Sequence, residues 1–411
     1  MDDVAWILNI RGSDIDFNPV FFSYCAVTMK EVVLFISSKQ VSDNLREALS
    51  SVDMEESVQI KDYDDIKRYI TSLGKEPGKV WFPKTASHGL VSLIPQALSV
   101  SKLSPVTVMK AIKNDVEMKG FENSHIRDAA ALIQYFAWLQ KNIHSGQVTE
   151  ISGADILESF RKEQDHFMGL SFPSISGVGP NGAIIHYRPE PETDRTITTE
   201  EMYLIDSGAQ YKDGTTDVTR TLHFGVPTDY EKECFTRVLK GMIQLGMSIF
   251  PDKCLGMRLD TLARMHLWNV GLDYGHGTGH GVGSFLNVHE GPSGISFRHN
   301  PNDPGIQEGM IFSDEPGYYE AGKFGIRLET LVKVVPTETK FNTGTKMLTF
   351  EAITLVPIQQ KLIDPTLMTR VEIDWLNSYH QTCRDKVAPL LKAAGKQSAL
   401  EWLYKETQPI G

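Results

Sequence analysis

Residues 276–289 read His276-Gly-Thr-Gly-His280-Gly-Val-Gly-Ser-Phe-Leu-Asn-Val-His289. The stretch contains four glycines, and a glycine inside a helix costs about 0.5–1 kcal/mol relative to alanine. This composition favours a chain that passes close to other groups and directs its imidazoles at them. His276 and His280 have the spacing of a helical zinc motif, but that motif carries a glutamate between its histidines. No glutamate lies between them here, so the chemistry of the stretch depends on residues elsewhere in the chain.

The composition is that of an ordinary globular protein. The chain has 411 residues, enough for roughly two or three domains, and 41% of them are hydrophobic and 23% charged, as in soluble proteins. A net charge of −11 argues against nucleic-acid binding, which needs clustered lysine and arginine. No apolar run is long enough to span a membrane, and four scattered cysteines fit a reducing compartment. We therefore expect a cytoplasmic protein with neither nucleic-acid nor membrane partners.

Residues 1–105 alternate short apolar runs with helical patterns, which predicts an α/β N-terminal domain. Residues 4–8 are already apolar, so we expect this domain to lack an earlier element. Ser42 is a candidate helix cap. The expected strands are 32–36 and 80–82, and the expected helices are 42–51 and 63–73.

Residues 106–411 mix strand and helix patterns and predict an α+β domain. Strand pairs interleaved with helix pairs form two similar blocks, which indicates internal pseudo-symmetry. Ser152 is the candidate cap of the second helix, and amphipathic helices are expected at the C-terminal end, up to Glu406. The expected helices are 112–142, 154–167, 229–248 and 258–270, and the expected strands are 172–178, 183–187, 202–208 and 216–224, with strand-rich blocks at 310–335 and 347–357.

Two aspartates flank a predicted hairpin. Asp206 ends an apolar strand, and Asp217 lies in the β-branched run Thr215–Thr221. A turn at Asp213-Gly214 brings the two side chains together on one face. Two carboxylates held that close repel each other unless a cation or a proton separates them. Taken alone, two aspartates at strand ends that face solvent explain the same pattern.

Further charged residues lie in or beside apolar strands downstream. Glu315 precedes a Pro-Gly turn, and Arg327 and Glu329 share one face of the strand that continues to residue 334. Charges in such strands are costly to bury unless they are paired or bound to a metal. Taken singly, each fits a surface charge or an ion pair better than a site residue.

Together these residues make a candidate metal site. The set has four carboxylates and one imidazole, an oxygen-rich donor set that suits Mn²⁺ better than structural Zn²⁺. Two metals about 3.5–4 Å apart lower the pKa of a bridging water and polarise a carbonyl group. The set therefore indicates metal-assisted amide hydrolysis. Its members are Asp206, Asp217, His280, Glu315 and Glu329.

The motifs around these residues resemble those of the pita-bread metallopeptidases. The similarity is strongest to the three-domain, cytosolic animal type of the Xaa-Pro aminopeptidase (aminopeptidase P) family. The resemblance implies a pita-bread catalytic domain over 106–411 after a creatinase-N-like α/β domain over 1–105. The family's first domain and the opening helix and strand of its second are missing. The matching segments are Asn9–Asp14, Ile184–Tyr187, Tyr203–Arg220, His276–His289, Asp314–Tyr319 and Thr407–Ile410.

The resemblance also assigns the metal ligands. It implies that Asp206 binds one divalent metal and that His280 and Glu315 bind the other. Asp217 and Glu329 are implied to bridge both metals, with a hydroxide between them. The expected metal is Mn²⁺, with Zn²⁺ and Co²⁺ as alternatives.

The resemblance further implies a substrate and its helpers. The expected substrates are peptides with proline at the second position, and a homodimer is expected. His186, His276 and His289 match histidines that orient substrate and transfer protons, and Arg327 matches a supporting residue. The histidines without such partners are interpreted as structural or surface residues; they include His88, His223 and His266.

Two other functions remain open. A prolidase, the dipeptide-specific relative on the same fold, is distinguished by its selectivity for peptide length. A catalytically impaired pita-bread domain used for binding is distinguished by its metal content, because such proteins usually lose ligands and this chain keeps all five.

Overall fold

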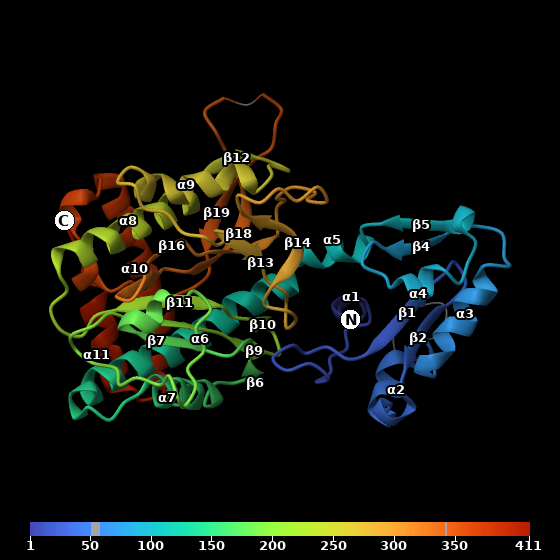
Figure 1. Cartoon of the computed structure of the whole chain (residues 1–411), viewed down its shortest axis with the longest axis horizontal. Helices are drawn as coiled ribbons and strands as arrows, with labels where there is room; N and C mark the ends of the chain where they lie inside the picture. Colours follow the sequence, from blue (N-terminus) through green and yellow to red (C-terminus); the bar gives the residue numbers. More distant parts are fainter. Residues whose placement is uncertain (51–57, 342) are drawn as a thin grey trace. The chain divides into compact units, whose positions relative to one another are not determined.

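The computed structural model describes residues 1–50, 58–341 and 343–411. The chain forms two compact units, Met1–Lys110 and Ala111–Gly411 (Figure 1). The domain boundary expected after residue 105 stays a prediction, since helix α5, Pro105–Ala111, begins there and ends in the second unit. Within the described ranges, no helix is both long and apolar enough to cross a bilayer.

The N-terminal unit contains the strands expected at 32–36 and 80–82 and helices within the expected ranges 42–51 and 63–73. Residue 51 lies outside the described residues, and residues 63–65 form a 3-10 helix. Strand β2 is a run of β-branched and aromatic residues, which favours a strand, and it lies between β1 (antiparallel) and β3 (parallel). The Ser42 hydroxyl accepts the backbone N–H of Leu45 at 3.2 Å and caps α2 as expected. The apolar residues 4–8 lie mostly in helix α1. The elements are α1 (Asp2–Ile7), β1 (Ser23–Val27), β2 (Val32–Ile36), α2 (Asp43–Ser50), β3 (Gln59–Lys61), α3 (Ile66–Leu73), β4 (Val80–Pro83), α4 (His88–Val91) and β5 (Ser99–Lys102).

The second unit begins with two capped helices, α6 (Asp115–Asn142) and α7 (Glu150–Lys162). The expectation that Ser152 caps α7 near residue 154 is wrong. Thr149 is the N-cap, and Ser152 stands at the third helical position, where its hydroxyl accepts the Thr149 N–H at 2.8 Å. This reciprocal capping box satisfies donors at the start of the helix and moves the start back by about one turn.

The first sheet of this unit has the order β11-β8-β7. Its strands are β7 (Ile175–Val178), β8 (Tyr203–Ser207) and β11 (Val218–Leu222). The expected hairpin is confirmed, because β9 (Ala209–Tyr211) pairs with β10 (Gly214–Thr215) around Asp213. Strand β6 (Phe167–Leu170) pairs with β9.

The expected strand at 183–187 is wrong. Residues 179–183 form a 3-10 helix, and a turn follows. The buried carboxylate of Glu150 accepts hydrogen bonds from the backbone N–H groups of Val178 (2.7 Å) and Arg195 (3.0 Å), and from the Tyr187 hydroxyl (2.8 Å). Such side-chain bonds satisfy a segment locally and compete with sheet pairing.

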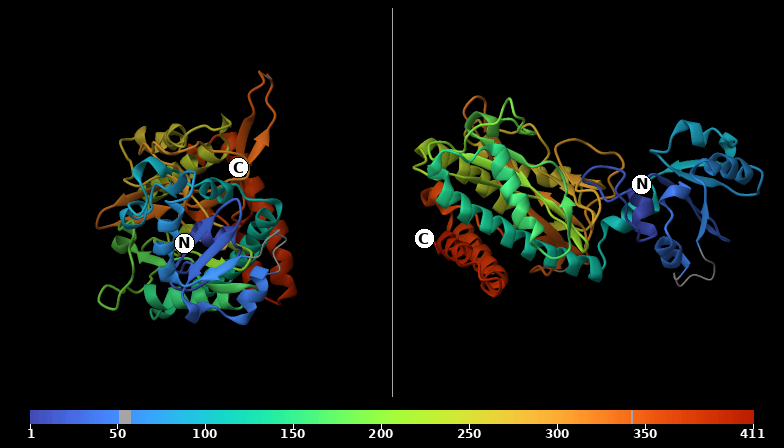
Figure 2. Two further views of the ribbon diagram at one scale, coloured as in Figure 1. Left: turned by 90° about the vertical axis from the view of Figure 1, so that its right-hand side faces the viewer. Right: turned by 90° about the horizontal axis from the view of Figure 1, so that it is seen from below.

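The second sheet is six-stranded, with the order β12-β19-β18-β15-β13-β14. Helices α8 (Asp229–Gly246) and α9 (Met257–Trp268) pack on each other, and α11 (Gln397–Glu406) packs on α6 and on α10 (Arg370–Ala393) (Figure 2). The strands are β12 (Ile249–Pro251), β13 (Gly279–Gly281), β14 (Glu290–Ile295), β15 (Ile311–Asp314), β18 (Thr330–Thr337) and β19 (Met347–Ala352), and a separate hairpin joins β16 (Gly317–Glu320) and β17 (Phe324–Arg327).

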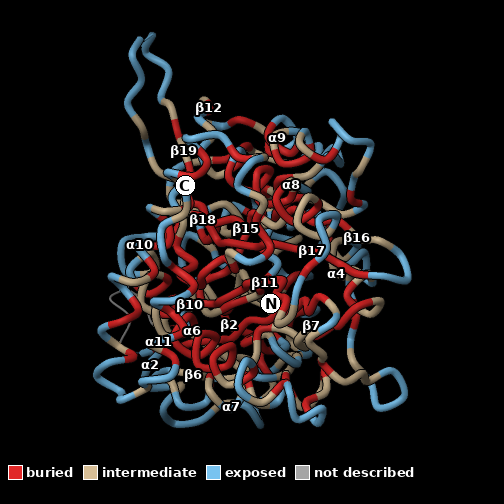
Figure 3. The backbone as a smooth tube through the Cα atoms, turned by 90° about the vertical axis from the view of Figure 1, so that its left-hand side faces the viewer, coloured by how far each residue is buried: buried red, intermediate tan, exposed pale blue. Residues whose placement is uncertain are grey.

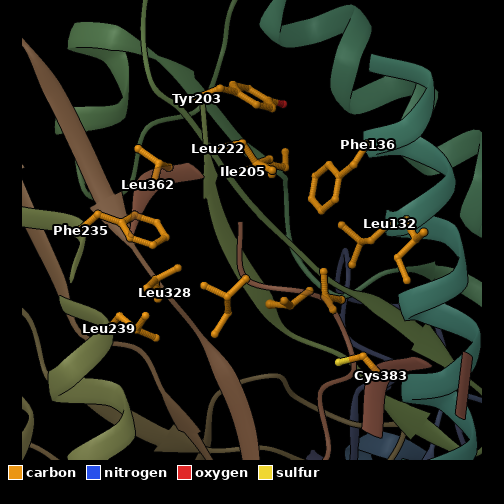
Figure 4. Packing of buried hydrophobic residues seen from close by; sticks show 14 of the residues in the cluster. Leu132, Phe136, Tyr203, Ile205, Leu222, Phe235, Leu239, Leu328, Leu362 and Cys383 are labelled. Carbon is orange, nitrogen blue, oxygen red and sulfur yellow. The ribbon is translucent and has the colours of Figure 1, made fainter. Parts of the chain in front are cut away.

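Separate hydrophobic clusters hold these elements together, one around the first sheet and one around the six-stranded sheet. Buried backbone follows the central strands, whereas the connecting loops are exposed (Figure 3). Phe136 of α6, Ile205 of β8 and Phe235 of α8 belong to one buried cluster, together with Leu328 between the sheets (Figure 4). Because helices and strands of both halves share this cluster, neither half buries its apolar face alone.

Arg220 of β11 links the two sheets and the C-terminal region. Its guanidinium is buried and donates to the backbone carbonyls of Val356 (2.7 Å), Pro357 (3.2 Å) and Glu329, and to the hydroxyl of Tyr379 (2.8 Å). A buried charge is tolerated when hydrogen bonds satisfy it. Arg220 therefore fixes β11 beside the segment that carries Glu329.

A buried ion pair joins α6 to α7. The Arg161 guanidinium donates from Nε and Nη2 to the two oxygens of Asp128 at 2.8 and 3.0 Å. The hydroxyl of Tyr211 donates to the same carboxylate at 2.9 Å. Removing one partner of such a pair leaves an uncompensated buried charge.

We predict that Asp128→Ala lowers the free energy of unfolding by about 3–5 kcal/mol, because Arg161 stays buried without its carboxylate. Urea denaturation followed by circular dichroism measures the change. The control is Glu158→Ala on α7, which removes the half-buried partner of the exposed Lys162 and should cost about 0–1 kcal/mol. Equal losses in the two variants would contradict the prediction.

Candidate metal centre

Asp206 and Asp217 come together at one end of the first sheet. Asp206 lies in β8, and Asp217 directly precedes β11, whose Val218 pairs with Ser207. Both side chains are buried. A Cβ atom at Gly208 would lie only 2.0 Å from the carbonyl oxygen of Thr216, so the crossing of the chain between the two aspartates requires glycine.

The remaining three expected ligands come from the second half of the unit. His280 lies in β13, Glu315 follows β15, and Glu329 stands between β17 and β18. Strand β13 approaches β15 so closely that a Cβ at Gly279 would lie 2.0 Å from the Ser313 carbonyl oxygen. The glycines around His280 therefore serve the close backbone approach expected of this stretch.

The structure brings all five residues into one cluster. Ligand atoms of Asp217, His280 and Glu329 lie within 4.8 Å of one another. His280 Nε2 is 3.4 Å from a carboxylate oxygen of Asp217 and 3.4 Å from one of Glu315. Asp206 lies near enough for its charge to raise the pKa of both Asp217 and Glu329.

The His280 ring has its lone pair on the atom that faces these carboxylates. Its Nδ1 is 2.9 Å from the Gly281 carbonyl oxygen, which only accepts hydrogen bonds. The Nδ1 atom therefore carries the proton, and in the neutral ring Nε2 is free to bind a metal. Metal-binding histidines usually have a second-nitrogen contact of this kind.

The electrostatics of the four carboxylates in the cluster favour a bound cation. Burial, followed by repulsion from neighbouring carboxylates, raises the pKa of Asp217 and Glu329 well above the ordinary range, and burial also raises the pKa of Glu315. Asp206 Oδ1 and Glu329 Oε1 are buried and have no hydrogen-bond donor among the described residues. Buried acceptors without donors, beside an imidazole lone pair, fit divalent cations.

Two hydroxyl groups that the sequence analysis missed hold the ligands. Thr219 donates to Glu329 Oε2 at 2.8 Å and accepts from Arg327 Nε at 3.1 Å. Ser313 donates to Glu315 Oε1 at 2.9 Å and accepts the His280 backbone N–H at 2.9 Å. Thr219 lies two residues after Asp217 and so shares its face of the strand, a pattern from which it could have been found.

Arg327, which the resemblance implies to be a supporting residue, lies against Asp206. Its Nη2 donates to Asp206 Oδ2 at 2.7 Å, and its Nη1 donates to the hydroxyl of Tyr319 at 2.8 Å. His276 Nδ1 lies 2.8 Å from the Gly277 carbonyl oxygen, so its Nε2 accepts the Tyr319 hydroxyl proton at 2.9 Å. Tyr319, within the segment Asp314–Tyr319, was not identified as a site residue from the sequence.

The other two histidines lie near the cluster in different environments. The ring of His289 meets that of His280 edge-on, with 4.2 Å between centroids. Burial and the neighbouring His280 lower the pKa of His289 to about 4. His186 is exposed on the turn that Glu150 holds, and its charge also contributes to lowering the pKa of His276 and His289.

The histidines interpreted as structural have no contact with the metal cluster among the interactions described. His88 begins α4 in the N-terminal unit. His223 Nδ1 accepts the backbone N–H of Gly225 at 3.0 Å, and His266 lies in α9. Their structural role stays a prediction.

Family comparisons cover nearly the whole chain. The creatinase/prolidase N-terminal domain matches residues 1–117, metallopeptidase family M24 matches residues 119–336, and the C-terminal region of peptidase M24 matches residues 346–410.

Individual relatives match the full length of the chain. Xaa-Pro aminopeptidase ApepP of Drosophila melanogaster is 52% identical over 413 residues, which cover 100% of this chain and 67% of the fly protein. Xaa-Pro aminopeptidase 1 of Dictyostelium discoideum is 46% identical, over 100% of this chain and 65% of that protein. The chain therefore spans about two thirds of the length of these relatives.

Solved structures show the same fold. The X-prolyl aminopeptidase of Caenorhabditis elegans, described as a cytosolic enzyme with a di-nuclear active site, superposes with a TM-score of 0.93 at 40% identity, over 100% of this chain and 67% of that one. An Xaa-Pro dipeptidase from Bacillus anthracis, 24% identical, superposes at 0.66 over 87% of this chain and 91% of its own, a likeness of fold alone. The α+β pita-bread fold expected from the sequence is confirmed, and the chain belongs to metallopeptidase family M24.

Proposed function

We propose that this chain is a metal-dependent Xaa-Pro aminopeptidase, which hydrolyses the bond between an N-terminal residue and a following proline. The observation that carries the proposal is the buried cluster, in which the His280 lone pair faces Asp217 and Glu315. In the same cluster, buried oxygens of Asp206 and Glu329 have no hydrogen-bond donor among the described residues. The names of the relatives and the di-nuclear active site of the nematode structure support the proposal. We propose two divalent ions, Mn²⁺ first because the donors are mostly oxygens, held by Asp206, Asp217, His280, Glu315 and Glu329.

The metal ions and the surrounding residues contribute differently. When bound, the two ions supply Lewis acidity for a carbonyl group and lower the pKa of water. Arg327 orients Asp206 through the hydrogen bond from Nη2. Tyr319 and the Gly277 carbonyl together fix the ring of His276. His289 stays neutral near neutral pH, since its pKa is about 4, so it keeps an N–H that donates to a carbonyl oxygen as negative charge develops there.

Further properties follow as proposals of the same kind. The nematode relative is described as cytosolic, which supports a cytoplasmic location for this chain. A homodimer stays a prediction from the family resemblance, and light scattering on the purified protein tests it. The nitrogen of the Xaa-Pro bond is a tertiary amide nitrogen and carries no hydrogen. Recognition of the second residue must therefore rest on apolar contact with the proline ring rather than on a hydrogen bond donated by this nitrogen.

The function is tested by hydrolysis of an Xaa-Pro-Pro peptide by the metal-stripped protein, with and without Mn²⁺. We predict metal-dependent release of the first residue. Glu329→Ala should abolish it and lower the number of bound metals, because it removes a proposed bridge. A fully active variant with two metals would refute the ligand set. Cleavage of dipeptides alone would indicate a prolidase, and a folded wild-type protein without metal would indicate a binding domain.

We predict that His289→Ala loses about 10²–10⁴-fold in kcat, the range for removal of a positioned proton donor, while it retains bound metal. Steady-state kinetics and metal analysis measure the two quantities. His144→Ala, at an exposed position away from the cluster, is the control and should behave like the wild type. If His289→Ala loses metal, then this residue belongs among the ligands instead.

Metal binding should strengthen as the pH rises. In the metal-free fold the pKa values of Asp217, Glu315 and Glu329 are raised. The stability they contribute is therefore present below the ordinary carboxyl pKa, about 4, and is lost as the pH rises through the raised values. Metals bind the ionised forms and release these protons.

We predict that the rise in Tm caused by Mn²⁺ is larger at about pH 8 than at about pH 6, because metal binding competes with protons. Scanning calorimetry at constant free Mn²⁺ measures it. Titration calorimetry in two buffers of different ionisation enthalpy should show net proton release, smaller in Glu315→Gln. A rise in Tm that is independent of pH would contradict the raised pKa values.

A further inference from the structure

The guanidinium of Arg264 on helix α9 donates hydrogen bonds to the carboxylate of Asp260 and to the loop that contains His276. Its side chain is 3% exposed. Nε and Nη2 donate to the two oxygens of Asp260 at 2.7 and 3.1 Å. The remaining hydrogen bonds reach the loop, from Nη1 to the carbonyl oxygen of Tyr274 (2.6 Å) and the carboxylate of Asp273 (3.0 Å), and from Nη2 to the carbonyl oxygen of His276 (2.6 Å). These five bonds match the five N–H donors of an arginine.

Two aromatic rings and a hydroxyl complete the arrangement. The guanidinium carbon lies 3.9 Å from the ring centroid of Tyr274 and 4.9 Å from that of Phe297. Asp260 accepts a further hydrogen bond from the hydroxyl of Thr278 at 2.6 Å, and this hydroxyl is also 2.6 Å from that of Tyr274. The ion pair therefore contacts the loop 273–280 at both ends of the segment that contains His276.

This loop needs external support. Gly275, Gly277 and Gly279 give it large backbone freedom in the unfolded chain. Strand pairing begins only at Gly279, so residues 273–277 have no sheet partner. Yet His276 and His280 must be held accurately, since a misplacement of about 1 Å at an active site can cost about 10²-fold in rate.

We propose that Arg264, with Asp260, is a positioning residue that fixes the loop 273–280 and so sets the places of the His276 and His280 imidazoles. The proposal rests on the proposed function for its catalytic consequence. Lysine cannot replace arginine here, because an ammonium group has three donors and no plane to lie between two rings. Arg264→Lys therefore keeps the charge and the contact with Asp260 but releases the loop.

The chain offers a matched control in Arg237 on α8. Arg237 also donates from Nε and Nη2 to a carboxylate four residues earlier, Glu233, at 2.9 and 2.7 Å. Its Nη1 also donates to a backbone carbonyl oxygen, that of His266, at 3.1 Å. This residue makes the same kinds of bonds but none of them reaches the loop 273–280. Arg237→Lys thus measures the effect on activity and metal binding of losing a guanidinium group that does not contact the loop 273–280.

The first measurement is amide hydrogen exchange of the metal-free proteins, read on peptides that cover residues 272–281. Arg264→Lys should speed exchange of this segment by about 10-fold or more, the mark of a local opening, while Arg237→Lys leaves it at the wild-type rate. Circular dichroism confirms that both variants are folded. Wild-type exchange in a folded Arg264→Lys protein would overturn the proposal.

The second measurement is Mn²⁺ titration calorimetry with steady-state kinetics on the Xaa-Pro-Pro peptide. Arg264→Lys should weaken Mn²⁺ binding and lower kcat, each by about 10-fold or more, because the loop places the imidazoles of His276 and His280. Equal losses in Arg237→Lys would overturn the positioning role. If the wild-type protein itself shows no metal-dependent hydrolysis, the proposed function fails, and the exchange comparison still decides whether Arg264 orders the loop.

Discussion

Mutual repulsion among buried carboxylates is the constraint on which the rest of this structure depends. Two like charges about 4 Å apart repel by several kcal/mol in a protein environment. Burial, followed by this repulsion, raises the pKa values of Asp217 and Glu329. A flexible segment would relieve the repulsion by moving apart. The fold prevents this because the proposed ligands come from strands and strand ends of two sheets, each packed on its own hydrophobic cluster. Arg220 and Thr219 of the first sheet also hold the Glu329 segment by hydrogen bonds. Binding of a cation among these carboxylates therefore offsets their electrostatic repulsion.

Different side chains hold the different carboxylates of the cluster. Hydroxyl donors satisfy one oxygen of Glu329 and one of Glu315 and leave the other side of each carboxylate available. Arg327 does the same for Asp206. Glu329, Glu315 and Asp206 are thus each held through one oxygen by a neighbouring side chain, which is how supporting residues usually orient metal ligands.

The sequence predicted those parts that depend on local pattern or on recognised motifs. The β-branched run around Asp217 and the Asp-Gly turn were enough to place the two aspartates on one hairpin, and periodicity located α6, α8 and α9. The errors arose where side chains override local preference. Residues 183–187 look like a strand, but the carboxylate of Glu150, far away in sequence, holds them in a turn. Tyr319 contacts the His276 ring, and Arg264 donates to the His276 carbonyl oxygen. Only the folded chain brings these partners together, and no spacing rule reveals such contacts.

The contacts of Arg220 have a consequence for the synthesis of the protein. Chains are made from the N-terminus at about 5–20 residues per second, so the hairpin with Asp206 and Asp217 leaves the ribosome before Glu329 does. The acceptors of Arg220 at Val356, Pro357 and Tyr379 come later still. A nascent chain that has reached only the first sheet contains Arg220 without its acceptors in the second sheet and the C-terminal region. It also contains Asp206 and Asp217 without the other residues of the cluster. The proposed metal ligands therefore come together only after the second sheet has been made.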